Sequence, residues 1–266
     1  MLRFIYVIAG CLYRIPYYIH QMKRYYNNPE QYKEEDCYRL ARKVAGLIKR
    51  KGRIETQVTG TENLPGEGGY IMYANHQGKY DALGVMLAHE KPCTFIIAKK
   101  QSGSVVTTQV VDLIRAKRLD FEDMRQQVTV MKEVTEEVVA GRRYLIFPEG
   151  GYGNNHNRLQ DFKTGSFQCA KRAKCPIIPV ALYDSYKAFG VNSLRRVKTQ
   201  VHFLKAIPYE EYGRLKTVEI RDLVVRRIRE QIFRIEHQCK RMDPVPGILW
   251  PEEDFFQDDL PEERYS

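Results

Sequence analysis

The sequence predicts an α/β protein built on a largely parallel sheet that is flanked by helices. Short apolar runs of strand length alternate with longer segments of helical periodicity along most of the chain, which is the pattern of successive strand–helix–strand units. The 266 residues are 43% hydrophobic, which is enough for one substantial core with room for a small appendage. No internal repeat and no long linker divides the chain.

The individual elements follow from clusters of apolar residues and from their spacing. Strands are expected at residues 53–59, 70–74, 94–98, 144–147, 177–182 and 197–204. Helices are expected at residues 30–50, 80–89, 122–140, 164–174 and 217–240, and a helix is preferred for the ambiguous segment 102–115. Gly52 and Gly141 each end a helix, Pro148 ends a strand, and residues 62–69 form a turn.

The amino-terminal residues combine apolar side chains with tyrosines and positive charges. Only ten uncharged residues separate Arg3 from Arg14, whereas a membrane-spanning helix needs about twenty. This composition favours a helical segment that lies in a membrane interface; the alternative is a helix packed on the protein's own core. We therefore expect a membrane-association segment at 1–52, a central domain at 53–240 and an acidic tail at 241–266.

Charge is unevenly distributed along the chain. The formal net charge is +10, and because residues 241–266 contribute −6, residues 1–240 carry +16. Such a body should attract nucleic acid, an anionic membrane or phosphorylated small molecules. No helix-turn-helix, zinc-finger or RNA-recognition motif is present in the sequence, so no nucleic acid partner is expected. A salt-dependent DNA-binding test would separate this rival interpretation from an enzyme.

The cysteines show no pattern of a metal site. Six are scattered through the sequence without a CxxC pair, which indicates reduced thiols inside a cell. Cys169 and Cys175 with His156 have a spacing that fits no zinc pattern, so small buried side chains are the simpler interpretation. We expect neither a metal nor a cofactor.

The stretch YIMYANHQGKYDALG, residues 70–84, carries the first candidate for chemistry. If His76 ends the strand and Asp81 lies in the first turn of the next helix, the two side chains can meet. A carboxylate on one imidazole nitrogen leaves the other free to accept a proton from a hydroxyl group. The alternative is a helix-capping aspartate beside a structural histidine, and the spacing alone does not decide between them.

Two further stretches place polar residues near strand or helix ends. YLIFPEGG delivers Glu149 to the end of a strand, followed by Gly150 and Gly151, whose backbone N–H groups can approach a ligand closely. FKTGSF places Lys163 just before a helix, a reasonable position for binding phosphate. Taken singly, the two stretches favour a plain turn with a solvated glutamate and a surface lysine at a capped helix.

Together the stretches NHQGKYD, FPEGG, FKTGSF and PIIPVAL resemble the glycerolipid acyltransferases, typified by lysophosphatidic acid acyltransferase, in both order and spacing. The resemblance covers about residues 55–205 and implies a glycerolipid-acyltransferase-like mixed sheet with an amino-terminal membrane-associated segment. It implies transfer of a fatty acyl group from an acyl thioester to the free hydroxyl of a lysophospholipid. The expected acceptor is 1-acylglycerol 3-phosphate, which would yield phosphatidic acid; another lysolipid or glycerol phosphate is the alternative, and a non-catalytic membrane-binding protein is a rival.

The resemblance also assigns roles to residues. His76 would be the general base and Asp81 its partner, while Glu149 and Gly150 would lie in the acceptor site. The donor would be acyl-carrier protein or acyl-CoA, and the protein would work at the cytoplasmic face of an anionic membrane. The chain departs from the family in three places, with Gly78 for a serine, Gly151-Tyr152 for Thr-Arg, and Asp120-Phe121 for Asp-Arg.

The departures remove the arginines that would bind the acceptor's phosphate. Our hypothesis is that Arg118 and Lys163, together with Lys100, replace them, because charge-assisted contacts are the strong ones for phosphate. The alternative is that these are solvated charges that only contribute to the positive body.

Overall fold

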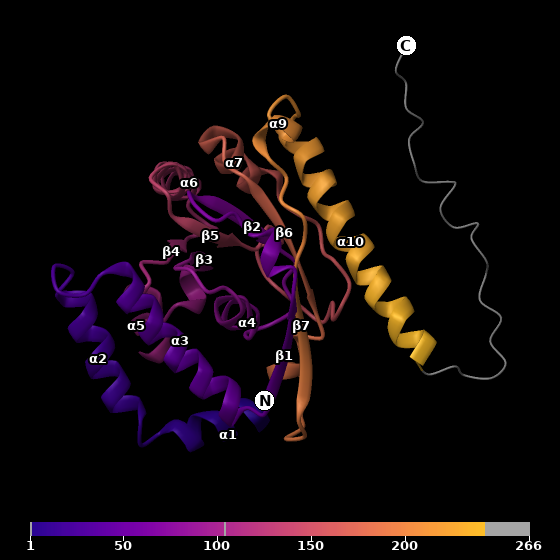
Figure 1. The fold of residues 1–266 in the computed structure, drawn as a ribbon. Helices are drawn as coiled ribbons and strands as arrows, with labels where there is room; N and C mark the ends of the chain where they lie inside the picture. The colour runs from indigo at the N-terminus through magenta and orange to yellow at the C-terminus, as the bar shows by residue number, and fades with distance from the viewer. Residues whose placement is uncertain (1, 104, 243–266) are drawn as a thin grey trace, which may run out of the picture. The chain divides into compact units, whose positions relative to one another are not determined.

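The computed structural model describes residues 2–103 and 105–242, with side chains up to residue 237 (Figure 1). The chain divides into two compact units, Met1–Ile232 and Phe233–Ser266. The candidate site lies in the first unit. Most of the predicted acidic tail, residues 243–266, lies outside the described residues, and the proposed boundaries at 52 and 240 stay predictions.

The first unit is built on a seven-stranded sheet. Its strands, in the spatial order β1-β7-β6-β2-β5-β3-β4, are β1 (Ile54–Thr59), β7 (Val197–Phe203), β6 (Ile177–Tyr183), β2 (Tyr70–Ala74), β5 (Arg143–Ile146), β3 (Thr94–Ala98) and β4 (Lys117–Leu119). Only the pairing of β6 with β7 is antiparallel among these strands. The predicted α/β class with a mixed, largely parallel sheet is therefore confirmed.

The helices follow the predicted alternation. They are α1 (Leu2–Cys11), α2 (Ile15–Asn27), α3 (Glu34–Lys51), α4 (Asp81–Ala88), α5 (Val105–Leu113), α6 (Met124–Val139), α7 (Phe167–Ala173), α8 (Lys187–Gly190), α9 (Tyr209–Tyr212) and α10 (Thr217–Met242), with short 3-10 turns η1 (Thr61–Asn63), η2 (Lys99–Gln101) and η3 (Thr164–Ser166). The ambiguous segment 102–115 contains α5, as preferred. The strand β4 was not predicted, because three residues with two charges give no apolar run.

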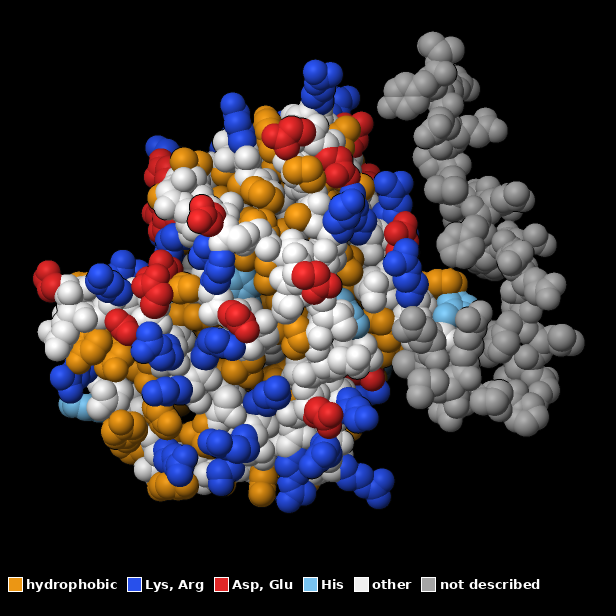
Figure 2. All heavy atoms as spheres, viewed as in Figure 1, with side chains coloured by type: hydrophobic (Ala, Val, Ile, Leu, Met, Phe, Trp, Pro, Cys, Tyr) orange, Lys and Arg blue, Asp and Glu red, His pale blue; other side chains and the backbone are white. Residues whose placement is uncertain are grey.

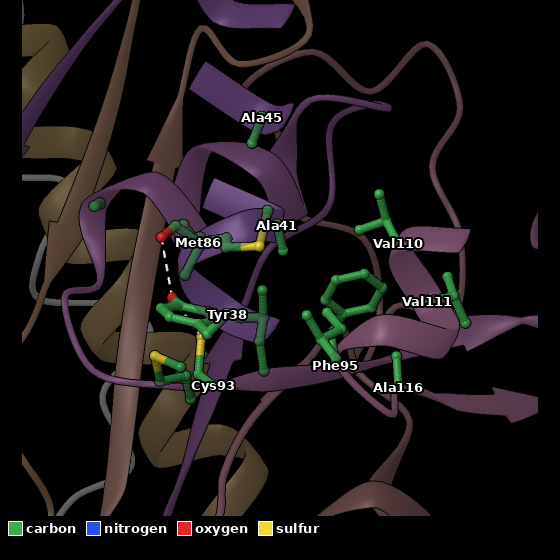
Figure 3. Close-up of a cluster of buried hydrophobic side chains, with 14 of the residues drawn as sticks. Tyr38, Ala41, Ala45, Met86, Cys93, Phe95, Val110, Val111 and Ala116 are labelled. Carbon is green, nitrogen blue, oxygen red and sulfur yellow. Dashed lines mark hydrogen bonds between the residues drawn. The ribbon is translucent and has the colours of Figure 1, made fainter. Parts of the chain in front are cut away.

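Two hydrophobic clusters cover the two faces of the sheet. Helices α2, α3, α4 and α5 pack on one face, and α6, α7 and α10 up to Ile232 pack on the other. Figure 3 shows part of the first cluster, in which the Tyr38 hydroxyl donates to the Met86 carbonyl at 3.0 Å. The five cysteines among the described side chains are free and buried, as small core residues would be.

The amino-terminal helices pack on α3 with one side and expose apolar side chains on the other. Val7 and Cys11 of α1 are buried against Leu47 of α3. Exposed hydrophobic residues follow along both helices: Leu2, Ile5, Tyr6, Ile8, Leu12, Tyr13, Tyr17 and Tyr26. Figure 2 shows hydrophobic side chains interspersed with Lys and Arg over this part of the molecule. Within residues 2–103 and 105–242, no helix is both long and apolar enough to cross a membrane.

The strand directions bring several segments to one edge of the sheet. The carboxyl ends of β2, β3, β5 and β6 meet there, because these four strands run parallel. The amino ends of β1 and β7 lie at the same edge, since β7 runs against β6 and β1 runs with β7. Side chains that follow β2 and β5 are thus placed side by side.

Candidate active site

The histidine of the first motif lies directly beyond the carboxyl end of β2. The preceding residue, Asn75, fixes this end by bonding across to β6: its amide donates to the Leu182 carbonyl at 3.0 Å, and its side-chain oxygen accepts from the Leu182 N–H at 2.8 Å. The backbone then turns sharply into α4, and Asp81 is the first residue of that helix.

The imidazole and the carboxylate meet as the motif required. His76 Nδ1 lies 2.7 Å from Asp81 Oδ2, and Asp81 is fully buried. The same carboxylate oxygen accepts the backbone N–H groups of Gln77 at 2.5 Å and Gly78 at 2.9 Å, while its other oxygen accepts the Ser185 hydroxyl at 2.5 Å. Donors on both oxygens fix the carboxylate in place.

The alternative role for Asp81 as a simple helix cap does not match this geometry. Residue Tyr80 occupies the cap position of α4 and makes no capping bond with its side chain. The carboxylate of Asp81 binds N–H groups of the turn before the helix and the imidazole of His76. Asp81 therefore closes the loop around the histidine instead of satisfying the first turn of α4.

Two aromatic rings surround the imidazole. Phe147 stacks on His76 with ring centroids 4.2 Å apart, and Tyr152 packs against it edge-on at 4.6 Å. The histidine side chain keeps 14% of its surface exposed. Because the carboxylate occupies Nδ1, that nitrogen carries the proton and Nε2 is left to accept one. Such an arrangement is suited to general-base chemistry.

Glu149 follows β5 and lies next to this centre. It is 8% exposed, and burial raises the pKa of its carboxyl group, although a hydrogen bond from Gln160 at 2.7 Å opposes the rise. Gly150 adopts a left-handed backbone, and a Cβ there would lie 2.9 Å from Lys163 Nζ. The glycine therefore allows the lysine to pack closely against the FPEGG turn.

The three predicted phosphate-binding cations are placed differently by the fold. Lys163 lies on the wall of the cavity described below, with its Nζ 4.9 Å from the Phe121 ring centroid. Arg118 instead donates to Asp112 at 2.6 Å, and Lys100 pairs with Glu122 at the surface. The structure thus brings Lys163 to the site and engages the other two in ion pairs away from it.

Several residues at the site were not identified from the sequence. Ser185 reaches Asp81 from the loop after β6, more than a hundred positions along the chain. The Gln77 amide donates to Asn157 Oδ1 and to the Leu182 carbonyl, both at 3.0 Å. Asn155 donates to the His76 carbonyl at 3.1 Å. Residues 150–157 are rich in glycine and asparagine, but nothing in this composition indicates which groups they would bond.

A large apolar cavity of about 1360 Å³ opens beside His76. Its wall includes residues from α1, α2, α3 and α5 on one side and from the FPEGG turn, α6 and α7 on the other. Three cations line it, Lys79, Lys163 and Arg172, and no carboxylate does among the described residues. Lys79 lies 4.8 Å from the Phe4 ring centroid, so the amino-terminal helix takes part in the cavity wall.

The chain is similar in sequence to known acyltransferases. Residues 55–183 match the family model described as Acyltransferase. The chain is 29% identical over 161 residues to 1-acyl-sn-glycerol-3-phosphate acyltransferase alpha of Homo sapiens, covering 59% of this chain and 56% of that protein. It is 26% identical over 202 residues to 1-acyl-sn-glycerol-3-phosphate acyltransferase of Borreliella burgdorferi, covering 72% and 76%.

The match to the mammalian relatives is partial, and a solved structure extends the comparison of the fold. The chain spans about half the length of the first curated relatives it matches. The crystal structure of the 1-acyl-sn-glycerophosphate acyltransferase PlsC from Thermotoga maritima has a TM-score of 0.70 at 18% identity, covering 88% of this chain and 95% of that one. The resemblance inferred from the four motifs is confirmed: residues 55–183 match the Acyltransferase family model, and the chain is similar in sequence to 1-acyl-sn-glycerol-3-phosphate acyltransferases and in fold to PlsC.

Proposed function

We propose that this protein transfers a fatty acyl group from an acyl thioester to the free hydroxyl of a lysophospholipid, with 1-acylglycerol 3-phosphate as the acceptor and phosphatidic acid as the product. The observation that carries the proposal is His76, paired with Asp81 and lying on the wall of an apolar cavity, within residues that match the Acyltransferase family model. A general base beside a space suited to hydrocarbon is what this reaction requires.

The geometry supports a direct transfer. Nε2 of His76 takes the proton of the acceptor hydroxyl as its oxygen attacks the thioester carbonyl carbon. The carbon–sulfur bond then breaks, and the departing sulfur receives the proton back from the imidazolium. Asp81 stabilises the imidazolium while it carries this charge, and Ser185 with the two N–H groups keeps the carboxylate in position.

We infer that the acyl chains occupy the cavity. Burial of hydrocarbon is worth about 0.8 kcal/mol for each CH₂ group, so an apolar wall formed by α1, α2, α3 and α5 would bind a long chain favourably. Helices α1 and α2 also expose apolar side chains on their outer side. This exposure supports the proposal that α1 and α2 lie on an anionic membrane at its cytoplasmic face, where the lysophospholipid acceptor and the phosphatidic acid product reside. Acyl-carrier protein and acyl-CoA both remain donors compatible with this site.

Two of the cations that line the cavity are best placed to bind the acceptor's phosphate. Lys163 lies against Gly150, and Arg172 lines the same cavity from α7. Arg118 and Lys100 hold ion pairs with acids, so using them for phosphate would leave those acids without their partners. We therefore propose Lys163 with Arg172 as the phosphate-binding pair, in place of the trio expected from the sequence.

The proposal is tested by thioester consumption with purified protein and a panel of lysophospholipids that differ in head group. Release of thiol should depend on the lysolipid and be fastest with 1-acylglycerol 3-phosphate. Replacing Lys163→Ala together with Arg172→Ala should raise the KM for this acceptor about tenfold or more and leave the KM for the donor nearly unchanged. A matched control, Lys100→Ala with Arg118→Ala, should change neither value greatly. If no lysolipid stimulates thiol release, the proposed function is wrong.

A further inference from the structure

We propose that Tyr152 is a gate over the general base, which keeps water away from His76 so that the acyl group goes to the lipid hydroxyl and is not hydrolysed. This inference rests on the proposed acyl transfer. It gives Tyr152 a role in excluding water, which is separate from the proton transfer assigned to His76 and Asp81.

The ring of Tyr152 lies directly against the imidazole of His76. Tyr152 packs edge-on against the imidazole at 4.6 Å, within the range of a favourable aromatic pair, and it lines the same cavity as His76. Phe147 stacks on that imidazole at 4.2 Å. The two rings together cover much of the histidine side chain, which keeps only 14% of its surface exposed.

The hydroxyl of Tyr152 takes no part in the contact between the Tyr152 ring and the His76 imidazole. It makes no hydrogen bond to any of the described residues, and burial raises its pKa, with the charge of Asp81 acting in the same direction. The phenol therefore stays neutral near pH 7, and the ring provides the contact. A phenylalanine at this position should serve equally well.

The backbone around Tyr152 is held on both sides while its immediate neighbours are open. The Gln160 side chain donates to the Gly151 carbonyl at 3.0 Å, and the Gly153 N–H donates to Asn155 Oδ1 at 3.2 Å. A Cβ added at Gly151 or at Gly153 would meet no atom within 4 Å. Glycines on either side give the backbone of Tyr152 freedom to rotate, while the anchors keep the loop at the site.

The chemistry explains why such a gate is needed. Water can replace the lipid hydroxyl as nucleophile: its oxygen attacks the thioester carbonyl, the carbon–sulfur bond breaks, and a free thiol and a fatty acid result. A base that activates one hydroxyl activates the other equally well, so exclusion of water has to decide the outcome. Tyr152 must move aside for the lysolipid and cover His76 when none is bound.

The experiment measures the partition of a radiolabelled acyl thioester between fatty acid and acylated lipid, with 1-acylglycerol 3-phosphate held below its KM in mixed micelles, and the kcat for transfer is measured separately at saturating acceptor. Tyr152→Ala should raise the ratio of hydrolysis to transfer about tenfold and lower the kcat for transfer. Tyr152→Phe should stay within about twofold of wild type. Tyr152→Leu, which keeps apolar bulk without a ring, should fall between them and provides a second variant if the alanine protein does not fold.

A hydrolysis-to-transfer ratio in folded Tyr152→Ala or Tyr152→Leu equal to that of wild type would overturn the gate. A large effect of Tyr152→Phe would also overturn it, since the hydroxyl would then be the active part. The failure of the proposed function is distinguishable, because wild-type protein would then show no lysolipid-dependent transfer at all, whatever the variants do.

Discussion

Two histidines are tied to opposite ends of strand β2, and they differ in partner and in access. His76 follows the carboxyl end, binds the Asp81 carboxylate and faces the cavity. His89 is 1% exposed, and its Nε2 lies 2.6 Å from the hydroxyl of Tyr70, the first residue of β2. Its Nδ1 lies 2.6 Å from the Lys91 carbonyl, so both ring nitrogens are occupied.

The difference indicates which of the two histidines is suited to general-base chemistry. Burial lowers the pKa of His89 to about 4, so it stays neutral at physiological pH and bonds to neutral partners. His76 has a carboxylate that can stabilise a positive imidazolium, and it keeps one nitrogen for a substrate. The partner and the free nitrogen, more than the residue type, decide which histidine can perform chemistry.

The largest effect on kcat is expected from replacing His76. His76→Ala should lower kcat by about 10²–10⁴-fold, because the reaction loses its proton acceptor. The melting temperature should change little, since the imidazole is partly exposed and only one of its nitrogens is bonded within the protein. Steady-state kinetics beside a thermal melt check both points. A variant with wild-type turnover would exclude His76 as the base.

The next effect concerns the partner. Asp81→Asn keeps the shape and removes the charge, so the imidazolium is no longer stabilised, and kcat should fall by about 10²-fold or more. Tyr70→Phe is the matched change at His89, since it removes the hydroxyl bonded to that histidine. It should leave kcat within about twofold of wild type and lower the free energy of unfolding by roughly 1–3 kcal/mol. Equal loss of kcat in both variants would contradict the distinction.

Replacing His89 should lower stability and leave catalysis intact, which is the opposite of the result expected for His76. His89→Ala leaves the Tyr70 hydroxyl and the Lys91 carbonyl without partners and opens a small cavity. The free energy of unfolding should fall by roughly 2–4 kcal/mol, while the kcat of the folded protein is retained. Urea unfolding combined with active-site-normalised rates measures both. Loss of kcat without loss of stability would show that His89 has a role in catalysis.

The last effect, seen only when the pH is varied, is a dependence of stability on pH. In the unfolded chain His89 titrates near its ordinary pKa of about 6.5, and in the folded protein at about 4. Between these values the unfolded state binds more protons, so the free energy of unfolding should fall as the pH drops from about 6.5 to 4 and be level above that window. The loss from this residue amounts to about 3 kcal/mol in total.

A variant isolates this contribution from that of other groups. Burial also lowers the pKa of His202, which acts in the same direction. His89→Gln cannot titrate, so its urea-derived stability should vary less between pH 6.5 and 4 than that of wild type. If the free energy of unfolding varied with pH in the same way for both proteins, His89 would have the same pKa in the folded and unfolded states.

The local pattern of the chain predicted much of the fold and the centre of the site. Six of the seven strands were predicted, and uninterrupted apolar runs located the central strands β2 and β6, because a strand buried on both faces needs such a sequence. The motif placed His76 at the end of β2 and Asp81 at the start of α4, where a sharp turn brings them together. These features depend on residues that are neighbours in the chain, and local sequence is sufficient to specify them.

Only the tertiary structure decided which distant residues meet. The reversal of β7 against β6, the approach of Ser185 to Asp81 and the placement of Tyr152 over His76 all depend on how complete elements pack. The cations show the same limit: Lys163 reaches the cavity wall while Arg118 finds Asp112. A charged side chain has the same appearance in sequence whether it is paired or free. Its role is set by a partner that only folding brings within a few ångströms, where electrostatic contacts become strong.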